Sequence, residues 1–174
     1  MKTLRNSMYA TLIVLTCIML TTACKKDSEG DGGSAKAGTI KAKVNGTAFE
    51  SSAMLSAANR VTVGSSTTVT VQGNDASGKT IMLIMLGLSE PGTYAIGGAG
   101  GANLTVTASY VEVNIANPTA SQTWQSPYDS SVAGEVTITE LSSTGIKGSF
   151  RFKGKNNSSD FMVDITDGAF NMNF

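Results

Sequence analysis

Carboxylates are the side chains of this sequence that remain as candidates for acid–base hydrolysis. The sequence has no histidine, which removes the usual general base, the usual zinc ligand and every triad built on imidazole. A glycosidase would need two carboxyl groups about 5–10 Å apart across a cleft. Because the candidates alternate with apolar residues, we expect them on the solvated side of strands and predict no enzyme. These candidates are Glu112, Glu135, Glu140, Asp160 and Asp164.

Trp124, the single tryptophan, is the best candidate for ligand binding. It lies in a polar stretch with two prolines, residues 117–128, which we expect at the end of the fold. Together with Tyr128 and Tyr110 it could stack on a sugar ring, while Gln122, Gln125 and Asp129 bond the hydroxyl groups. The alternative, which we favour, is that Trp124 closes the end of the hydrophobic core.

Two segments, residues 74–78 and residues 27–31, offer the oxygen ligands that calcium prefers. Neither has the ligand spacing or the closing glutamate of a dedicated calcium loop. We interpret the first as a hairpin turn and the second as part of a linker. The sequence therefore predicts no metal and no cofactor.

Cys24 carries a different kind of chemistry, because its surroundings are typical of a bacterial lipoprotein signal. A basic start with Lys2 and Arg5 precedes an apolar run from Tyr9 to Ala23. That run is shorter than the roughly 20 residues needed to span a bilayer. We expect residues 1–23 to be removed as a signal peptide and Cys24 to be acylated, which would make the membrane a partner. An ordinary secretory signal with a cysteine near its cleavage site is the alternative.

The segment 24–37 is rich in glycine, serine and charge, and this composition predicts a flexible tether. Loss of Lys2 and Arg5 with the signal would leave 11 of the 13 basic residues against 13 acidic ones. This balance is unlike that of a nucleic-acid-binding protein. Cys17 would leave with the signal peptide, so no disulfide is possible within one mature chain.

Residues 38–174 read as strands almost throughout, because apolar and polar residues alternate and turn sequences separate the runs. The sequence predicts one all-β domain, an antiparallel β-sandwich, with a closed or partly open antiparallel barrel as the alternative. The apolar positions expected to face inward are Ile40, Ala42, Val44, Val69, Val71, Leu104, Val106, Ala108, Tyr110, Val136, Ile138, Ile146, Phe150, Phe152, Phe161, Val163, Ile165, Phe170, Met172 and Phe174. The expected turns include residues 45–46, 74–78, 90–92, 142–145, 155–157 and 167–168.

Ile81–Leu88 departs from this pattern, since it is apolar at odd and even positions alike. It predicts a central strand covered on both faces, so a charge placed at Ile84 would be buried. Residues 49–60 fit a helical turn or an irregular strand, and we assign them to neither. Residues 97–101 are expected to form a flexible loop, because they lack the lysine and the following helix of a phosphate-binding loop.

Several stretches of the chain resemble a family of small lipoproteins from Bacteroidota-type bacteria, each with one β-rich domain of unknown function. The matching stretches are IKAKVNGTAFES from Ile40, PGTYAIGG from Pro91, GEVTITEL from Gly134, GIKGSFRF from Gly145 and DITDGAFNMNF from Asp164. The resemblance implies a β-sandwich in the cell envelope and carries no catalytic residue. The charged residues after Cys24 also resemble, loosely, the signals that send such lipoproteins to the outer face of the outer membrane.

From these observations we expect a lipid-anchored, non-enzymatic binding or structural module of the outer membrane. A surface glycan-binding accessory to polysaccharide uptake is the first alternative, and a carboxylate-dependent glycosidase is the second. A glycan or an envelope protein would be the partner.

Overall fold

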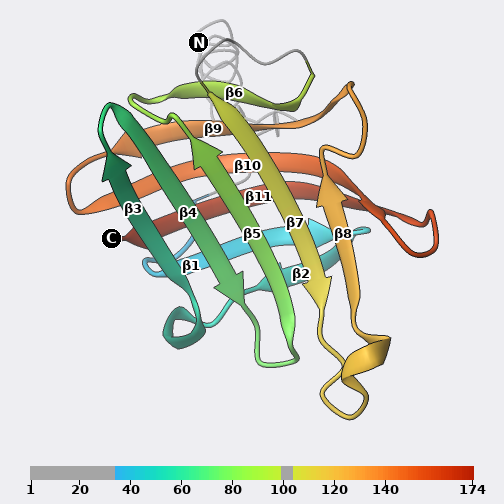
Figure 1. The fold of residues 1–174 in the computed structure, drawn as a ribbon. Coiled ribbons are helices and arrows are strands. Elements are labelled where there is room, and N and C mark those ends of the chain that lie inside the picture. Colours follow the sequence, from blue (N-terminus) through green and yellow to red (C-terminus); the bar gives the residue numbers. More distant parts are fainter. Residues whose placement is uncertain (1–33, 99–103) are drawn as a thin grey trace, which may run out of the picture.

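The computed structural model describes residues 34–98 and 104–174, and almost all of their regular structure is β-strand (Figure 1). The predicted signal peptide, Cys24 and most of the predicted tether lie outside the described residues. The two helical elements of the described part are single 3₁₀ turns, and neither could cross a membrane. The predicted all-β antiparallel fold is confirmed. The elements are β1 (Thr39–Val44), β2 (Thr47–Glu50), η1 (Ala53–Leu55), β3 (Ala57–Val63), β4 (Ser66–Asn74), β5 (Lys79–Leu86), β6 (Gly92–Gly97), β7 (Thr105–Glu112), η2 (Pro118–Ala120), β8 (Gln122–Ser126), β9 (Val132–Leu141), β10 (Gly145–Asn156) and β11 (Met162–Asn173).

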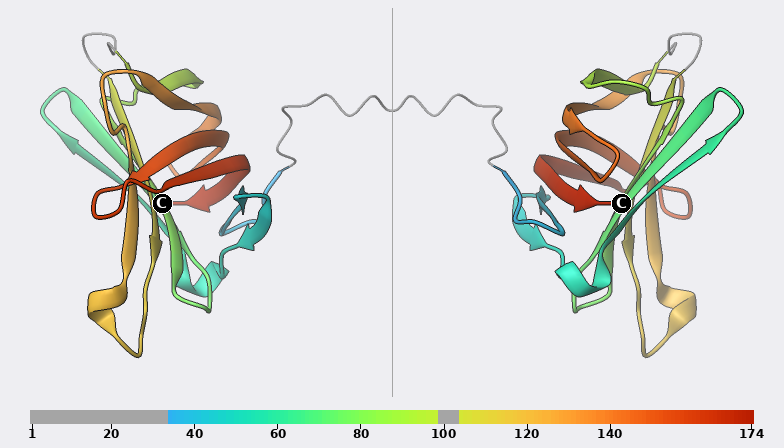
Figure 2. Two further views of the ribbon diagram at one scale, coloured as in Figure 1. Left: turned by 90° about the vertical axis from the view of Figure 1, so that its right-hand side faces the viewer. Right: turned by 90° about the vertical axis from the view of Figure 1, so that its left-hand side faces the viewer.

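The strands form one continuous sheet that folds over on itself as a half-barrel (Figures 1 and 2). The front layer contains β3, β4, β5, β7 and β8, and the rear layer contains β2, β1, β11, β10, β9 and β6. The strands of the two layers cross at a large angle. The layers are joined where the end of β10 pairs with β8, at Lys155 opposite Gln125 and Asn156 opposite Trp124. The two layers thus face each other as in a sandwich while remaining parts of one sheet.

The core lies between the layers and is built from alternate residues of each strand. Both layers contribute side chains that are almost fully buried. Examples are Val69, Leu83 and Tyr110 of the front layer and Ile40 and Phe170 of the rear layer. The predicted inward positions are therefore confirmed for most strands. Phe161 is the exception, because it lies in the loop before β11 and is 72% exposed.

β11 differs from the prediction, because Asp167 and Gly168 form a bulge inside one long strand instead of a turn between two strands. Ile165 pairs with Phe152 and Gly168 with Phe150, so β11 carries one extra residue at this point. Asp167 adopts a φ of 50°. A Cβ on Gly168 would meet the Phe150 carbonyl oxygen at 2.5 Å, so the bulge requires glycine there. The bulge also moves the core-facing side from odd-numbered to even-numbered residues.

β5 is the predicted strand in the middle of the front layer, between β4 and β7. Its odd-numbered side chains, Ile81, Leu83 and Met85, are completely buried in the core. The prediction that both of its faces are covered is wrong. Met82 and Ile84 are only partly buried, Leu86 is 48% exposed, and no second layer of the described residues covers that side. Ile84 therefore faces outward.

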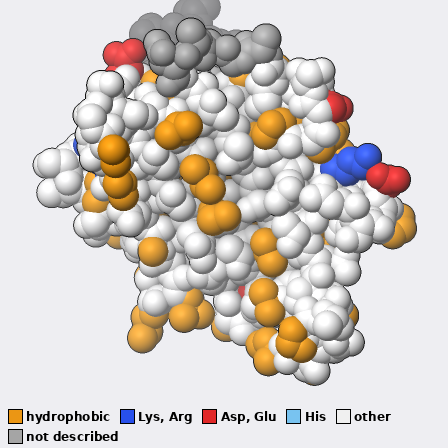
Figure 3. Space-filling view, viewed as in Figure 1, with side chains coloured by type: hydrophobic (Ala, Val, Ile, Leu, Met, Phe, Trp, Pro, Cys, Tyr) orange, Lys and Arg blue, Asp and Glu red, His pale blue; other side chains and the backbone are white. Residues whose placement is uncertain are grey.

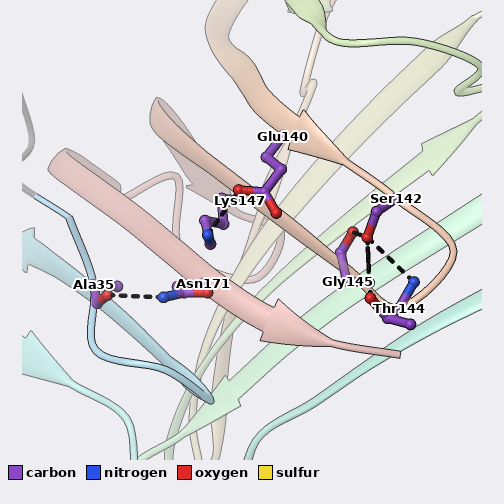
Figure 4. Close-up of polar contacts among 7 residues, drawn as sticks. All are labelled: Ala35, Glu140, Ser142, Thr144, Gly145, Lys147 and Asn171. Carbon is purple, nitrogen blue, oxygen red and sulfur yellow. Dashed lines mark hydrogen bonds and ion pairs between the residues drawn. The ribbon is translucent and has the colours of Figure 1, made fainter.

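The segment that the sequence left unassigned, residues 49–60, contains the end of β2, the turn η1 and the first half of β3. At the start of the described chain, Ala35 is buried and its carbonyl accepts a hydrogen bond from Asn171 (Figure 4). Lys36 pairs with Glu50. Ala35 and Lys36 thus contact the domain, although they belong to the segment 24–37, which was predicted to be a flexible tether.

Candidate functional site

The outward side of the front layer forms a surface without charge, which we call the uncharged face. The strand register places its side chains in rows, such as Val61, Thr68, Leu86 and Thr105. The face consists of Asn59, Val61, Val63, Ser66, Thr68, Thr70, Gln72, Asn74, Thr80, Met82, Ile84, Leu86, Thr105, Thr107, Ser109, Val111, Thr123 and Gln125.

The charged residues of these five strands do not lie at outward positions. In each strand they fall at the odd or even positions that also carry the core-facing residues. Arg60 donates a hydrogen bond from Nη1 to the Ser142 carbonyl oxygen at the edge of the fold. Lys79 and Glu112 lie opposite each other at the end of β5 and β7, with 4.0 Å between the lysine nitrogen and the nearer carboxylate oxygen. The absence of charge from the outward side is thus a property of the whole layer.

The outer side of the rear layer has the opposite character, because ion pairs cover it. Arg151 pairs with Glu135 at 3.1 Å across β10 and β9. Figure 4 shows Lys147 beside Glu140, with 2.7 Å between nitrogen and oxygen. Two further pairs, Lys43 with Asp167 and Lys153 with Asp164, link β11 to its neighbours. Among the outward-facing strand residues of the two layers, charge is therefore confined to the rear layer.

An apolar stripe crosses the uncharged face along β5 and consists of Met82, Ile84 and Leu86. Figure 3 shows apolar side chains in a diagonal series across this side of the molecule, with charged side chains mainly near its margins. Threonines flank the stripe, since Thr70 and Thr107 lie opposite Ile84 on the neighbouring strands. An exposed apolar stripe with a polar margin is typical of an interaction surface.

A shallow groove of about 370 Å³ lies on this face between β5, β7 and β8. Its lining includes Met82, Ile84, Thr107, Ser109 and Gln125. Methyl groups, hydroxyl groups and one amide thus meet in a space near the lower limit of small-ligand sites. The groove could hold one small uncharged group by apolar contact and a few hydrogen bonds.

Trp124 packs against the core, in the position that the core-closing interpretation predicted. Its ring centroid lies 5.5 Å from that of Tyr110. Its indole nitrogen is buried and has no hydrogen-bond partner among the described residues. Gln122 and Gln125, which the sequence assigned to sugar hydroxyls, accept hydrogen bonds from Asn156 and Asn157 respectively.

Tyr128 lies apart from Trp124, over the outer side of the rear layer. It lines a groove of about 350 Å³ with Arg151, Lys153, Asp164 and other residues. The structure therefore does not bring Trp124 and Tyr128 together as the stacking platform that was the less favoured interpretation. Asp129, the third polar candidate, accepts hydrogen bonds from the Ser131 backbone and hydroxyl, and these bonds lower the pKa of Asp129.

Each of the five candidate catalytic carboxylates has a positively charged partner. Glu135, Glu140 and Asp164 face outward as predicted, in the ion pairs described above. Asp160 lies in the loop after β10, where a hydrogen bond from Lys155 lowers the pKa of the aspartate. Glu112 differs from the prediction, because it lies at a position of β7 that alternates with the outward ones. Its carboxylate accepts a hydrogen bond from the Tyr110 hydroxyl, with 2.6 Å between the two oxygen atoms. Burial, with this hydrogen bond, raises the pKa of Tyr110, so the phenol stays neutral.

The segment 74–78 forms the predicted turn between β4 and β5. The Asp75 carboxylate accepts hydrogen bonds from the backbone of Ser77 and Lys79 and from the Ser77 hydroxyl, each at 2.8 Å. Burial alone would raise the pKa of Asp75, but these hydrogen bonds outweigh it and the pKa is lowered. The Asp75 carboxylate therefore stabilises the turn and is not free to bind a ligand. Among residues 34–98 and 104–174, no cluster of acidic or cysteine side chains could hold a metal ion.

The sequence reasoning missed the uncharged face. The missed signal is the composition of the positions between the apolar ones in residues 66–74 and 105–111, where threonine and serine recur and lysine and glutamate are absent. These outward positions normally carry the charges of a soluble sheet.

Comparison with protein families found that residues 36–172 match the family described as Domain of unknown function (DUF6252). No curated protein and no solved structure matches the chain.

Proposed function

The chain belongs to the DUF6252 family, and we propose that it is a non-enzymatic binding module, held in the cell envelope by a lipid on Cys24, whose partner binds the uncharged face. One observation carries the binding role: charge is absent from one outer surface and dense on the other. Interface cores are depleted of lysine, glutamate and aspartate, since these side chains lose hydration on burial.

The proposed anchor rests on the sequence around Cys24. Two or more acyl chains would hold the protein stably at a bilayer. Ala35 is buried against the domain, so the ten residues from Lys25 to Ser34 would separate it from the lipid on Cys24. Incorporation of labelled fatty acid tests the anchor: the parent chain should be labelled and Cys24→Ser should not. Equal labelling of the two would refute it.

Site-specific photo-cross-linking in cells tests the binding role. A photoreactive residue at Thr107, on the uncharged face, should give a discrete adduct, and Ile84→Lys should abolish it. The matched control is the same photoreactive residue at Thr139, which is exposed on the rear layer. Equal adducts from both positions, or an adduct at Thr107 that survives Ile84→Lys, would contradict a role for this face.

The Tyr128 groove supports a second candidate function, binding of an acidic glycan. Its aromatic ring lines the groove with Arg151 and Lys153, which pair with Glu135 and Asp164. In this candidate function the carboxylate or sulfate group of a sugar replaces these partners beside the ring. An array of neutral and acidic glycans tests this: binding should be confined to acidic glycans and should be lost in Tyr128→Ala. Binding that survives in this variant would remove the groove from consideration.

A further inference from the structure

β3 has an open edge. It pairs with β4 on one side, and among the described residues no strand pairs with its other side. The two strands are joined by a tight turn at Gly64 and Ser65, where Gly64 adopts a φ of 62°. Figure 2 shows the β3–β4 hairpin extending away from the rear layer, so another chain could approach the edge.

The backbone of β3 offers unused hydrogen-bonding groups along this edge. In a two-residue hairpin the pair next to the turn is hydrogen-bonded, here Val63 with Ser66, and alternate residues then face the partner strand. The N–H and C=O groups of Ala58, Arg60 and Thr62 therefore point away from β4. No hydrogen bond from the backbone of these three residues reaches another described segment. They form a template for one more antiparallel strand.

The other edges of the sheet are protected in ways that β3 is not. β2 has only four residues. β6 is preceded by Pro91, begins and ends with glycine, and has an irregular register at its end. β3 has seven residues in unbroken register with β4 and contains neither proline, glycine nor lysine. Proteins usually blunt exposed edges with such features.

The side chains of β3 specify the kind of strand that would pair with it. Val61 is 50% exposed and Val63 is 76% exposed on the uncharged face. Arg60 is the only charged residue of the strand, and its guanidinium is drawn toward Ser142, in the β9–β10 turn shown in Figure 4. An added strand should therefore be apolar on the outward side and should place no positive charge opposite Arg60.

We propose that this strand is β3 of a second copy, paired antiparallel about a two-fold axis at Val61. In this register Val61 faces Val61 of the second copy, Asn59 faces Val63, and Arg60 faces Thr62. The unused groups of Arg60 and Thr62 bond one another, and the exposed valines are covered. A register centred on Arg60 would set two like charges opposite each other, which is unfavourable. The pairing joins two front layers into one sheet with a continuous uncharged face.

Disulfide trapping tests the register. The sequence has two cysteines, Cys17 and Cys24, so in the full chain with both changed to serine an introduced cysteine is the only thiol. Facing residues in a non-hydrogen-bonded antiparallel pair have Cα atoms about 4.5 Å apart, within the range for a disulfide. Val61→Cys should give a disulfide-linked dimer under mild oxidation. The matched control, Thr68→Cys, lies beside Val61 on β4 and should give none.

Two further variants test the backbone pairing. Thr62→Pro removes an edge N–H group that β4 does not use, and it should abolish the cross-link of Val61→Cys, whereas Thr62→Ala should keep it. Val61→Glu sets two carboxylates opposite each other without disturbing the core, and it should sediment as a monomer under conditions in which the parent chain dimerises. A Val61→Cys cross-link no stronger than that of Thr68→Cys, or one that survives Thr62→Pro, would overturn the proposal. A parent chain that stays monomeric at high concentration would also overturn it.

Discussion

Leu83 and Ile84 are neighbours on β5 that face opposite sides of the front layer, and lysine at each position should have very different effects. Leu83 is completely buried in the core, whereas Ile84 is partly buried on the uncharged face. Lysine at 83 would place an ammonium group between the two layers. Lysine at 84 could lay its aliphatic part along Thr70 and Thr107 and keep its charge in water.

The expected magnitudes follow from burial. Leu83→Lys loses about 2–3 kcal/mol of apolar burial and adds several kcal/mol for an unpaired buried charge. The total approaches the whole stability of a typical domain, about 5–15 kcal/mol. Ile84→Lys loses part of one apolar contact and about 1 kcal/mol or less of strand preference. We expect a cost of about 1–2 kcal/mol.

Urea unfolding followed by far-ultraviolet circular dichroism measures both effects. With a slope of about 1–3 kcal/mol per molar urea, a cost of about 1–2 kcal/mol means that Ile84→Lys should lower the midpoint by roughly 0.3–2 M. Leu83→Lys should show no folded baseline, or a midpoint several molar lower. Comparable destabilisation by the two variants would show that another segment covers Ile84. That result would refute both the assignment of this face to solvent and the binding role proposed for it.

Two further predictions concern Trp124 and Asp75. Trp124 closes the end of the core, and its indole nitrogen makes no hydrogen bond to a described residue. In a denaturant titration, Trp124→Ala should therefore lower the free energy of unfolding by about 3 kcal/mol and Trp124→Phe by about 1 kcal/mol. Equal losses for the two variants would assign an essential role to the indole N–H. The pKa of Asp75 is lowered by folding, so its carboxylate stabilises the fold above the unfolded value of about 4 and loses that contribution as pH falls through the folded value. The stability difference between the parent and Asp75→Asn should therefore be constant from pH 7 to about pH 5 and shrink toward pH 2, and a difference that persists at pH 2 would contradict this account of the turn.

The alternation of side chains predicted most of the fold, because a half-buried strand repeats every two residues. It correctly placed Val69, Val106 and Val136 in the core. It could not reveal which strands lie side by side, since β1 pairs with β11 from the far end of the chain. The turn at Asn45 and Gly46 was predictable from its residues, which adopt φ values of 48° and 81°.

The errors arose where a local pattern had two structural explanations. An aspartate followed by a glycine suits both a turn and a bulge, and only the pairing of β11 with β10 distinguishes them at Asp167. The apolar run of β5 suits a strand covered on both faces, but it also suits a strand with one exposed apolar side. The platform that was the alternative for Trp124 is not assembled, because Trp124 on β8 packs against the core, whereas Tyr128 lies beyond the end of β8 and lines a groove over the rear layer. The spacing of the two residues in the sequence could not show this.

The pairing of β1 with β11 determines when the fold can be completed, because the two strands lie at opposite ends of the domain. Thr39, near the start of the domain, pairs with Asn171, a few residues from the end of the sequence. β3, β4 and β5 can form successive hairpins from local contacts alone, but β1 has only the short β2 beside it until β11 is in place. Such long-range pairing is slow, because a long loop must close first. A folding intermediate should therefore have a formed front layer and an unfinished rear layer, and a deletion within β11 would remove pairing partners of both β1 and β10.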